Sequence, residues 1–103
     1  MQAGVIAENP LGYALSGVVD ASTLVSSLTF GSAAAGIPPG TSLLLVQPQT
    51  QAIRWRDDGI VPTATVGYPL AAGAELRYTG RGLANLRVIS QAAGAIINVV
   101  AYG

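Results

Sequence analysis

The chain has 103 residues, of which half are apolar and 10% are charged, and its net charge is zero. It fits one domain whose charged share is far below the roughly 25% of ordinary soluble domains. It has no cysteine, histidine or lysine, which excludes disulfides and removes the commonest metal ligand and the usual bases for a catalytic serine. We therefore expect no enzyme, no cofactor and, with arginines and carboxylates equal in number, no nucleic-acid partner. The neutral composition favours a surface buried against other subunits over the alternative, a compact monomer.

The first 22 residues lack a clear hydrophobic period and are interrupted by glycines and Pro10. They are also too apolar for a segment that stays unfolded. We expect an N-terminal arm over residues 1–22, with a short strand near Tyr13 to Val19, that packs on a neighbouring subunit through Val5, Ile6 and Tyr13. The alternative is a frayed terminus. Residues 23–103 are expected to form a single β-sandwich domain.

The stretch from Ala21 to Ile53 carries no charge. Glycines and prolines interrupt it, so no apolar helix of about 20 residues fits, and we expect no membrane partner. Ala21 to Phe30 fits either a helical turn or a strand, and its Ser/Thr content favours a strand. After a loop, Ser42 to Gln47 is predicted to form a doubly buried strand that Pro48 ends. A short connection then suggests a hairpin with the next strand.

That next strand holds the only tryptophan. Ile53 and Trp55 alternate with Arg54 and Arg56, which is the period of a strand with one buried face. An Asp-Asp-Gly sequence follows and favours a tight turn. The polar side chains are expected on a solvated face or at an interface, where arginines bind carboxylates of the same chain or of a neighbour. These candidate interface residues are Arg54, Arg56, Asp57 and Asp58.

The rest of the chain is a connection from Ile60 to Tyr68, followed by Pro69 and by a turn at Ala72-Gly73. Strands are then predicted at Glu75 to Thr79, Asn85 to Ser90 and Ile96 to Tyr102. Six or seven short strands without a clear helix indicate an all-β fold, an antiparallel β-sandwich or small jelly-roll-like barrel with an extended N-terminal arm. The expected core residues are Leu43, Leu45, Ile53, Trp55, Leu76, Tyr78, Leu86, Val88, Ile97 and Val99.

Two binding chemistries can be considered around Trp55. The carboxylates of Asp57 and Asp58 suit calcium, but a calcium site wants more acidic residues than this stretch offers, so we expect no metal. An aromatic ring flanked by arginine and acid suits a sugar, together with the loop from Ile60 to Tyr68. The sugar hypothesis is disfavoured because the alternation with Ile53 buries Trp55 and the sequence indicates no second exposed aromatic.

Several strings resemble small structural proteins of tailed bacteriophages and prophages. They are Ala52 to Gly59, Pro62-Thr63, Gly67, Pro69-Leu70, Gly73, Tyr78, Leu83 to Ile89 and Ala93-Gly94-Ala95. The resemblance covers roughly residues 40 to 103 and implies a virion structural protein of all-β fold, with no functional residue to carry over. Such proteins are assembled in the bacterial cytoplasm and end up in the virion.

Composition and resemblance together favour a capsid decoration, or cement, protein. It would self-associate as a trimer or ring and bind the major capsid protein or other virion proteins. The first alternative is a head–tail connector or a tail or fibre accessory protein. The second is a carbohydrate-binding module.

Overall fold

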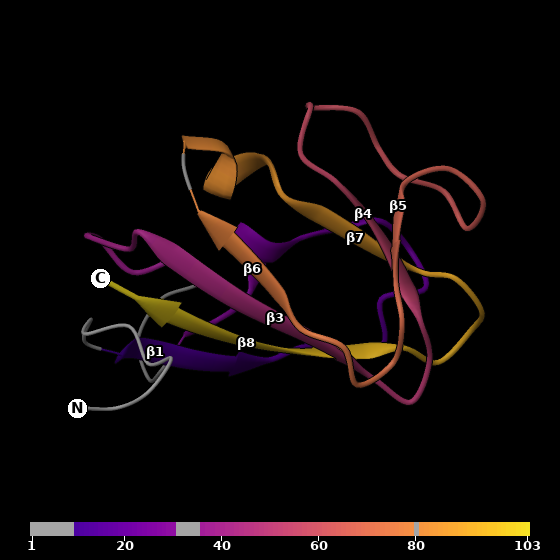
Figure 1. The fold of residues 1–103 in the computed structure, drawn as a ribbon, viewed down its shortest axis with the longest axis horizontal. Coiled ribbons are helices and arrows are strands. Elements are labelled where there is room, and N and C mark those ends of the chain that lie inside the picture. The colour runs from indigo at the N-terminus through magenta and orange to yellow at the C-terminus, as the bar shows by residue number, and fades with distance from the viewer. Residues whose placement is uncertain (1–9, 31–35, 80) are drawn as a thin grey trace.

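The computed structural model describes residues 10–30, 36–79 and 81–103. These form two four-stranded antiparallel sheets (Figure 1). In spatial order, the first sheet contains β1 (Pro10–Leu15), β8 (Ile96–Tyr102), β3 (Leu43–Gln49) and β6 (Leu76–Thr79). The second contains β2 (Thr23–Leu24), β7 (Arg87–Ser90), β4 (Ile53–Arg56) and β5 (Tyr68–Leu70). Two short 3-10 turns, η1 (Val25–Ser27) and η2 (Arg81–Asn85), complete the described structure. The predicted all-β sandwich is confirmed.

The strand pairs are nested. β1 pairs with β8, β2 with β7, β3 with β6 and β4 with β5, all antiparallel. The chain therefore resembles one long ribbon that folds back at the β4–β5 connection and is then wrapped into two layers. Additional β3–β8 and β4–β7 pairs join neighbouring turns of the wrap. This is the strand order of a jelly roll.

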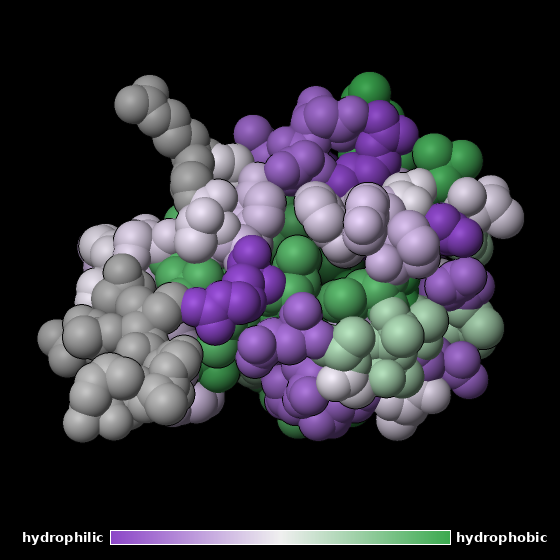
Figure 2. Space-filling view, viewed as in Figure 1, coloured by the Kyte–Doolittle hydropathy of each residue, from purple (hydrophilic) through white to green (hydrophobic). Residues whose placement is uncertain are grey.

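The wrap does not close into a barrel. Among the described residues, no strand of one sheet pairs with a strand of the other. Figure 2 shows apolar groups (green) in the middle of its view, between the positions that β6 and β5 occupy in Figure 1. The fold is therefore an open two-sheet sandwich, and the barrel form of the expectation is not found.

The core lies between the sheets and follows the strand register. In the first sheet, Val46 lies beside Val99 on one side and Leu76 on the other. Ile53 and Val88 face them from the second sheet, and both are fully buried. Other expected core residues with no exposure are Leu86, Ile97 and Val99. Trp55, Leu76 and Tyr78 are partly buried and pack against this cluster.

The core assignment on β3 needs a correction. Leu44 and Val46 belong to the cluster between the sheets, and the expected Leu43 and Leu45 do not. Leu43 is nevertheless buried, as expected, whereas Leu45 is only half-buried. The register pairs Leu45 with Val100, on the opposite side of the sheet from Leu44. The physical reason is that an unbroken apolar run has no period, so only pairing with β6 and β8 decides which face is inside.

Pro48 does not end β3, contrary to expectation. The strand continues to Gln49, opposite Ile96 of β8. On its other side, β3 pairs with β6 only up to Val46. The carbonyl oxygen of Pro48 accepts a hydrogen bond from Gly73 N at 2.8 Å, which is on the β6 side. The nitrogen that lacks a hydrogen faces the same side, beyond the end of the β6 ladder, so the proline costs no ladder bond.

The predicted hairpin of β3 with β4 is also wrong. The two strands lie in different sheets, and β4 pairs with β5 and β7. Between them, Thr50 adopts a positive φ of 69° and the chain crosses to the second sheet. Short loop length alone therefore did not predict the pairing, because a sandwich corner needs as few residues as a hairpin.

The N-terminal stretch contributes an edge strand. β1 starts at Pro10, earlier than the predicted strand near Tyr13 to Val19, and pairs with β8. Val5 and Ile6 lie outside the described residues. The ambiguous stretch from Ala21 to Phe30 contains both the short strand β2 and the 3-10 turn η1.

Candidate functional site

The outer side of the first sheet carries exposed apolar residues. The register places Tyr13, Val100 and Leu45 in one row across β1, β8 and β3, and Arg77 of β6 ends that row. Tyr13 is 64% exposed and Leu15 is 62% exposed. We call this surface the apolar face and define it by Tyr13, Leu15, Leu45, Val100 and Tyr102. Side chains of this kind are normally turned inward, so their gathering on one outer face indicates a binding surface.

A shallow groove of about 460 Å³ runs over the apolar face between β1 and β3. Tyr13 and Leu15 form one wall, and Gln47 and Asn98 supply polar groups. The groove ends at β1, which pairs only with β8 among the described residues. An edge strand with a free side can accept a further strand. The groove and the edge together offer apolar contact and main-chain hydrogen bonds to a partner.

The outer side of the second sheet is different, because it carries arginines. The register places Arg54 on β4 beside Ile89, and Arg56 opposite Arg87. The guanidinium of Arg54 donates to the carbonyl oxygens of Ala64 at 3.0 Å and Gly67 at 2.9 Å. Arg54 therefore fixes the β4–β5 connection within its own chain, which is a use that sequence analysis did not anticipate.

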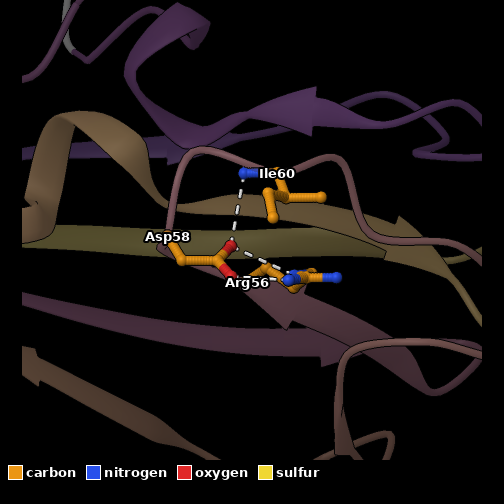
Figure 3. A network of polar contacts seen from close by, with 3 residues as sticks. All are labelled: Arg56, Asp58 and Ile60. Atoms are coloured by element: carbon orange, nitrogen blue, oxygen red, sulfur yellow. Dashed lines mark hydrogen bonds and ion pairs between the residues drawn. The ribbon is translucent and has the colours of Figure 1, made fainter.

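Arg56 and Asp58 form an ion pair, which Figure 3 shows together with Ile60. The guanidinium donates through Nε at 3.1 Å and through Nη2 at 2.5 Å. Asp58 Oδ1 also accepts from the backbone N–H of Ile60 at 3.2 Å. Both bonds lower the pKa of Asp58, and the bond from Arg56 is the larger cause. The pair holds the turn after β4, and its partners are two residues apart in one chain.

The remaining predicted interface residue, Asp57, joins the two sheets. Its Oδ2 accepts a hydrogen bond of 2.6 Å from the hydroxyl of Tyr78 on β6. Burial, then the hydrogen bond to Asp57 and its negative charge, raises the pKa of Tyr78 to about 12. The two neighbouring aspartates thus have separate partners: Asp58 holds its own loop, and Asp57 contacts the opposite sheet.

An aromatic cluster lies beside these acids. The ring centroids of Trp55 and Tyr68 are 5.4 Å apart with planes tilted by 40°. Those of Trp55 and Tyr78 are 6.1 Å apart in an edge-to-face arrangement. Tyr68 is 68% exposed, so one ring of the cluster is open to solvent. The sequence did not indicate this second exposed aromatic, because Pro69 made β5 resemble a connection. An edge strand tolerates such a proline.

These residues surround a hollow of about 320 Å³. We call it the Trp55 hollow and define it by its lining residues Trp55, Arg56, Asp57, Asp58, Gly67 and Tyr68. Gly67 has a φ of 142°, and a Cβ there would lie 3.0 Å from that of Arg54. The glycine is therefore needed for the loop to close over β4. The hollow combines aromatic, acidic and basic groups, whereas the apolar face is mainly hydrophobic.

Comparisons of the chain with protein-family models, with curated proteins and with solved structures found no match. In the part of the chain that the structure describes, three or more acidic residues never gather as a metal site would require. No helix in the same residues is both long and apolar enough for a membrane span. The two surfaces defined above are therefore the features on which a functional proposal can be built.

Proposed function

We propose that this protein is a bacteriophage virion structural protein, and that it acts as a capsid decoration protein which self-associates and binds the capsid surface. The observation that carries the proposal is the apolar face. Tyr13 and Leu15 each leave more than half of their surface exposed on the edge strand β1. A subunit that stays alone in water gains nothing from presenting these groups, whereas a subunit that docks on another buries them.

The distribution of charge supports the same proposal. Arg77 is the charged residue in the row that crosses the apolar face, so docking there removes few charges from water. The net charge of zero leaves no long-range repulsion between copies. The protein's partners are then its own copies and the major capsid protein or another virion protein. The jelly roll is compatible with this role, since capsid domains use it, but lectins do so as well.

Size-exclusion chromatography with light scattering tests the self-association. We expect the wild-type protein to form a trimer or ring at micromolar concentration. Leu15→Glu should be a folded monomer, because it places a carboxylate in the contact. Ile60→Glu is the matched control: Ile60 is also exposed, at 55%, but lies on the β4–β5 connection. A wild-type monomer, or equal effects of the two substitutions, would contradict an interface at the apolar face.

Co-sedimentation with capsids tests the second half of the proposal. The capsids should come from the phage or prophage whose genome carries this coding sequence, prepared without the protein. We expect wild-type and Ile60→Glu proteins to pellet with capsids and Leu15→Glu to remain in the supernatant. Binding to tails alone would favour a connector or tail accessory protein. No binding to either would rule out the virion role.

A further inference from the structure

We propose that the Trp55 hollow is a binding site for a neutral sugar. This inference is independent of the proposed virion role, because it rests on a different surface and different residues. The hollow is lined by the two kinds of group that bind a sugar. These are an aromatic ring for its C–H groups and polar groups for its hydroxyls. Its volume of about 320 Å³ is enough for a small ligand.

Tyr68 supplies the aromatic surface. It lies directly opposite Trp55 in the β4–β5 register, so both side chains are on the same side of the sheet. Trp55 is anchored against the core, whereas Tyr68 is 68% exposed. The negative face of an aromatic ring attracts polarised C–H groups such as those on one face of a hexose. The tilted contact of Tyr68 with the anchored indole holds its ring in place before a ligand arrives.

The polar groups of the hollow have unused hydrogen-bonding capacity. Asp57 uses Oδ2 for Tyr78, and its Oδ1 has no partner among the described residues. Arg56 binds Asp58 through Nε and Nη2, which leaves Nη1 as a donor without a partner in the same residues. A sugar hydroxyl both donates and accepts. Both residues line the hollow, so one free acceptor and one free donor are available for hydroxyl recognition.

The balance of charge disfavours an anionic ligand. Two carboxylates and one guanidinium line the hollow, and Asp58 neutralises Arg56 through the ion pair. The unpaired charge in the lining is therefore the carboxylate of Asp57, which would repel an anionic ligand. In addition, Nε1 of Trp55 is buried without an acceptor among the described residues. Such a donor usually marks a missing oxygen partner, for example a bound water.

The hollow is also held in one shape by hydrogen bonds of its lining residues. Arg54 fixes the carbonyl of Gly67 at 2.9 Å, and Asp58 fixes the N–H of Ile60 at 3.2 Å. The first bond ties the β4–β5 connection to the strand β4, and the second closes a turn within the connection, where Asp58 is itself paired with Arg56 of β4. A pre-formed wall lowers the entropy cost of binding, so a small ligand can be held by few contacts.

The test is a nuclear magnetic resonance titration that follows the indole N–H signal of Trp55. The chain has one tryptophan, so the signal is unambiguous. The probes are glucose, galactose, mannose and N-acetylglucosamine and oligosaccharides of each, with choline and N-acetylneuraminic acid as charged probes. We expect at least one neutral sugar to shift the signal saturably with a Kd on the order of millimolar. Both charged probes should bind more weakly.

Two variants locate the site. Tyr68→Ala and Asp57→Asn should each weaken sugar binding about tenfold or more, through loss of the ring and of the acceptor. Tyr13→Ala is the matched control for Tyr68→Ala, since Tyr13 is a 64% exposed tyrosine on the apolar face; it should leave sugar binding unchanged. No shift with any neutral sugar, a stronger response to choline, or equal binding by Tyr68→Ala would overturn the proposal. None of these results bears on self-association, which light scattering measures separately.

Discussion

The hydroxyl of Tyr78 on β6 donates a 2.6 Å hydrogen bond to Asp57, the residue that follows β4. This bond joins the edge strand of the first sheet to the loop that leaves the second sheet. It connects the two layers, which no strand pairing joins within the described residues. Burial and the neighbouring carboxylate raise the pKa of Tyr78 to about 12.

The raised pKa predicts a loss of stability in alkaline solution. An unfolded tyrosine loses its proton near pH 10, whereas folded Tyr78 keeps it until about pH 12. Between these values the unfolded state binds fewer protons, so the free energy of unfolding falls as pH rises. Urea unfolding on either side of pH 10 measures the fall. Tyr78→Phe should cost about 1 kcal/mol at neutral pH and flatten the alkaline slope. Identical slopes for the two proteins would refute the assignment.

Trp55 is predicted to stabilise the fold as well as to line the hollow. Because the indole is partly exposed, Trp55→Ala should cost about 3 kcal/mol, the low end of the range for emptying a large aromatic from a core. Tyr68→Ala, its exposed ring neighbour, should cost about 0.5 kcal/mol. Denaturant unfolding gives both values. The wild-type fluorescence should be blue-shifted and partly shielded from acrylamide. Emission like that of free tryptophan would mean that the faces of β4 are reversed.

Gly67 is predicted to be irreplaceable in the β4–β5 connection. A Cβ there would lie 3.0 Å from Arg54 Cβ and 3.3 Å from the carbonyl oxygen of Trp55. Gly67→Ala should cost about 2–4 kcal/mol and distort the hollow. Gly59→Ala is the control: its φ of 84° is also positive, but nothing lies within 4 Å of the added carbon, so the cost is about 1 kcal/mol. Thermal unfolding compares the two, and equal losses would show that crowding is unimportant.

Thr50 offers a stabilising substitution. It has a φ of 69°, which is strained for a β-branched residue. Its hydroxyl lies 2.5 Å from the carbonyl oxygen of Gly94, in the β7–β8 connection, and donates a hydrogen bond to it. Thr50→Asn keeps a polar donor and tolerates this backbone better, so it should raise stability by about 0.5–1 kcal/mol. A lower melting temperature for Thr50→Asn would show that the hydroxyl bond outweighs the strain.

The sequence predicted strands and their buried sides where apolar and polar residues alternate. Alternation at Ile53 and Trp55 predicted β4 and its buried side, and the last strand has the predicted bounds, Ile96–Tyr102. Where the pattern had no period, as in the apolar run of β3, the inward face could not be read, because register with distant strands decides it. The predicted hairpin of β3 with β4 was wrong for the same reason, because a jelly roll pairs strands that are far apart in sequence.

The candidate site was only half visible in the sequence. Trp55, Arg56 and the two aspartates were found because they are adjacent. Tyr68 was expected only as the end of a loop near Trp55, and Tyr78 only as a core residue. The ring contacts of both with Trp55 were not predicted, because they depend on strand register and sheet packing. Likewise, the apolar face gathers Tyr13, Leu45 and Val100 from three strands, and no linear pattern shows that they share a row.

An image of the virion by electron cryomicroscopy tests the central proposal most directly. The particles should be those of the phage or prophage whose genome carries this coding sequence. The account predicts density for the jelly roll on the capsid surface, with Tyr13 and Leu15 of the apolar face buried in contacts with a second copy or with the capsid protein. Copies confined to the tail, particles without the protein, or an apolar face open to solvent on the capsid would contradict it.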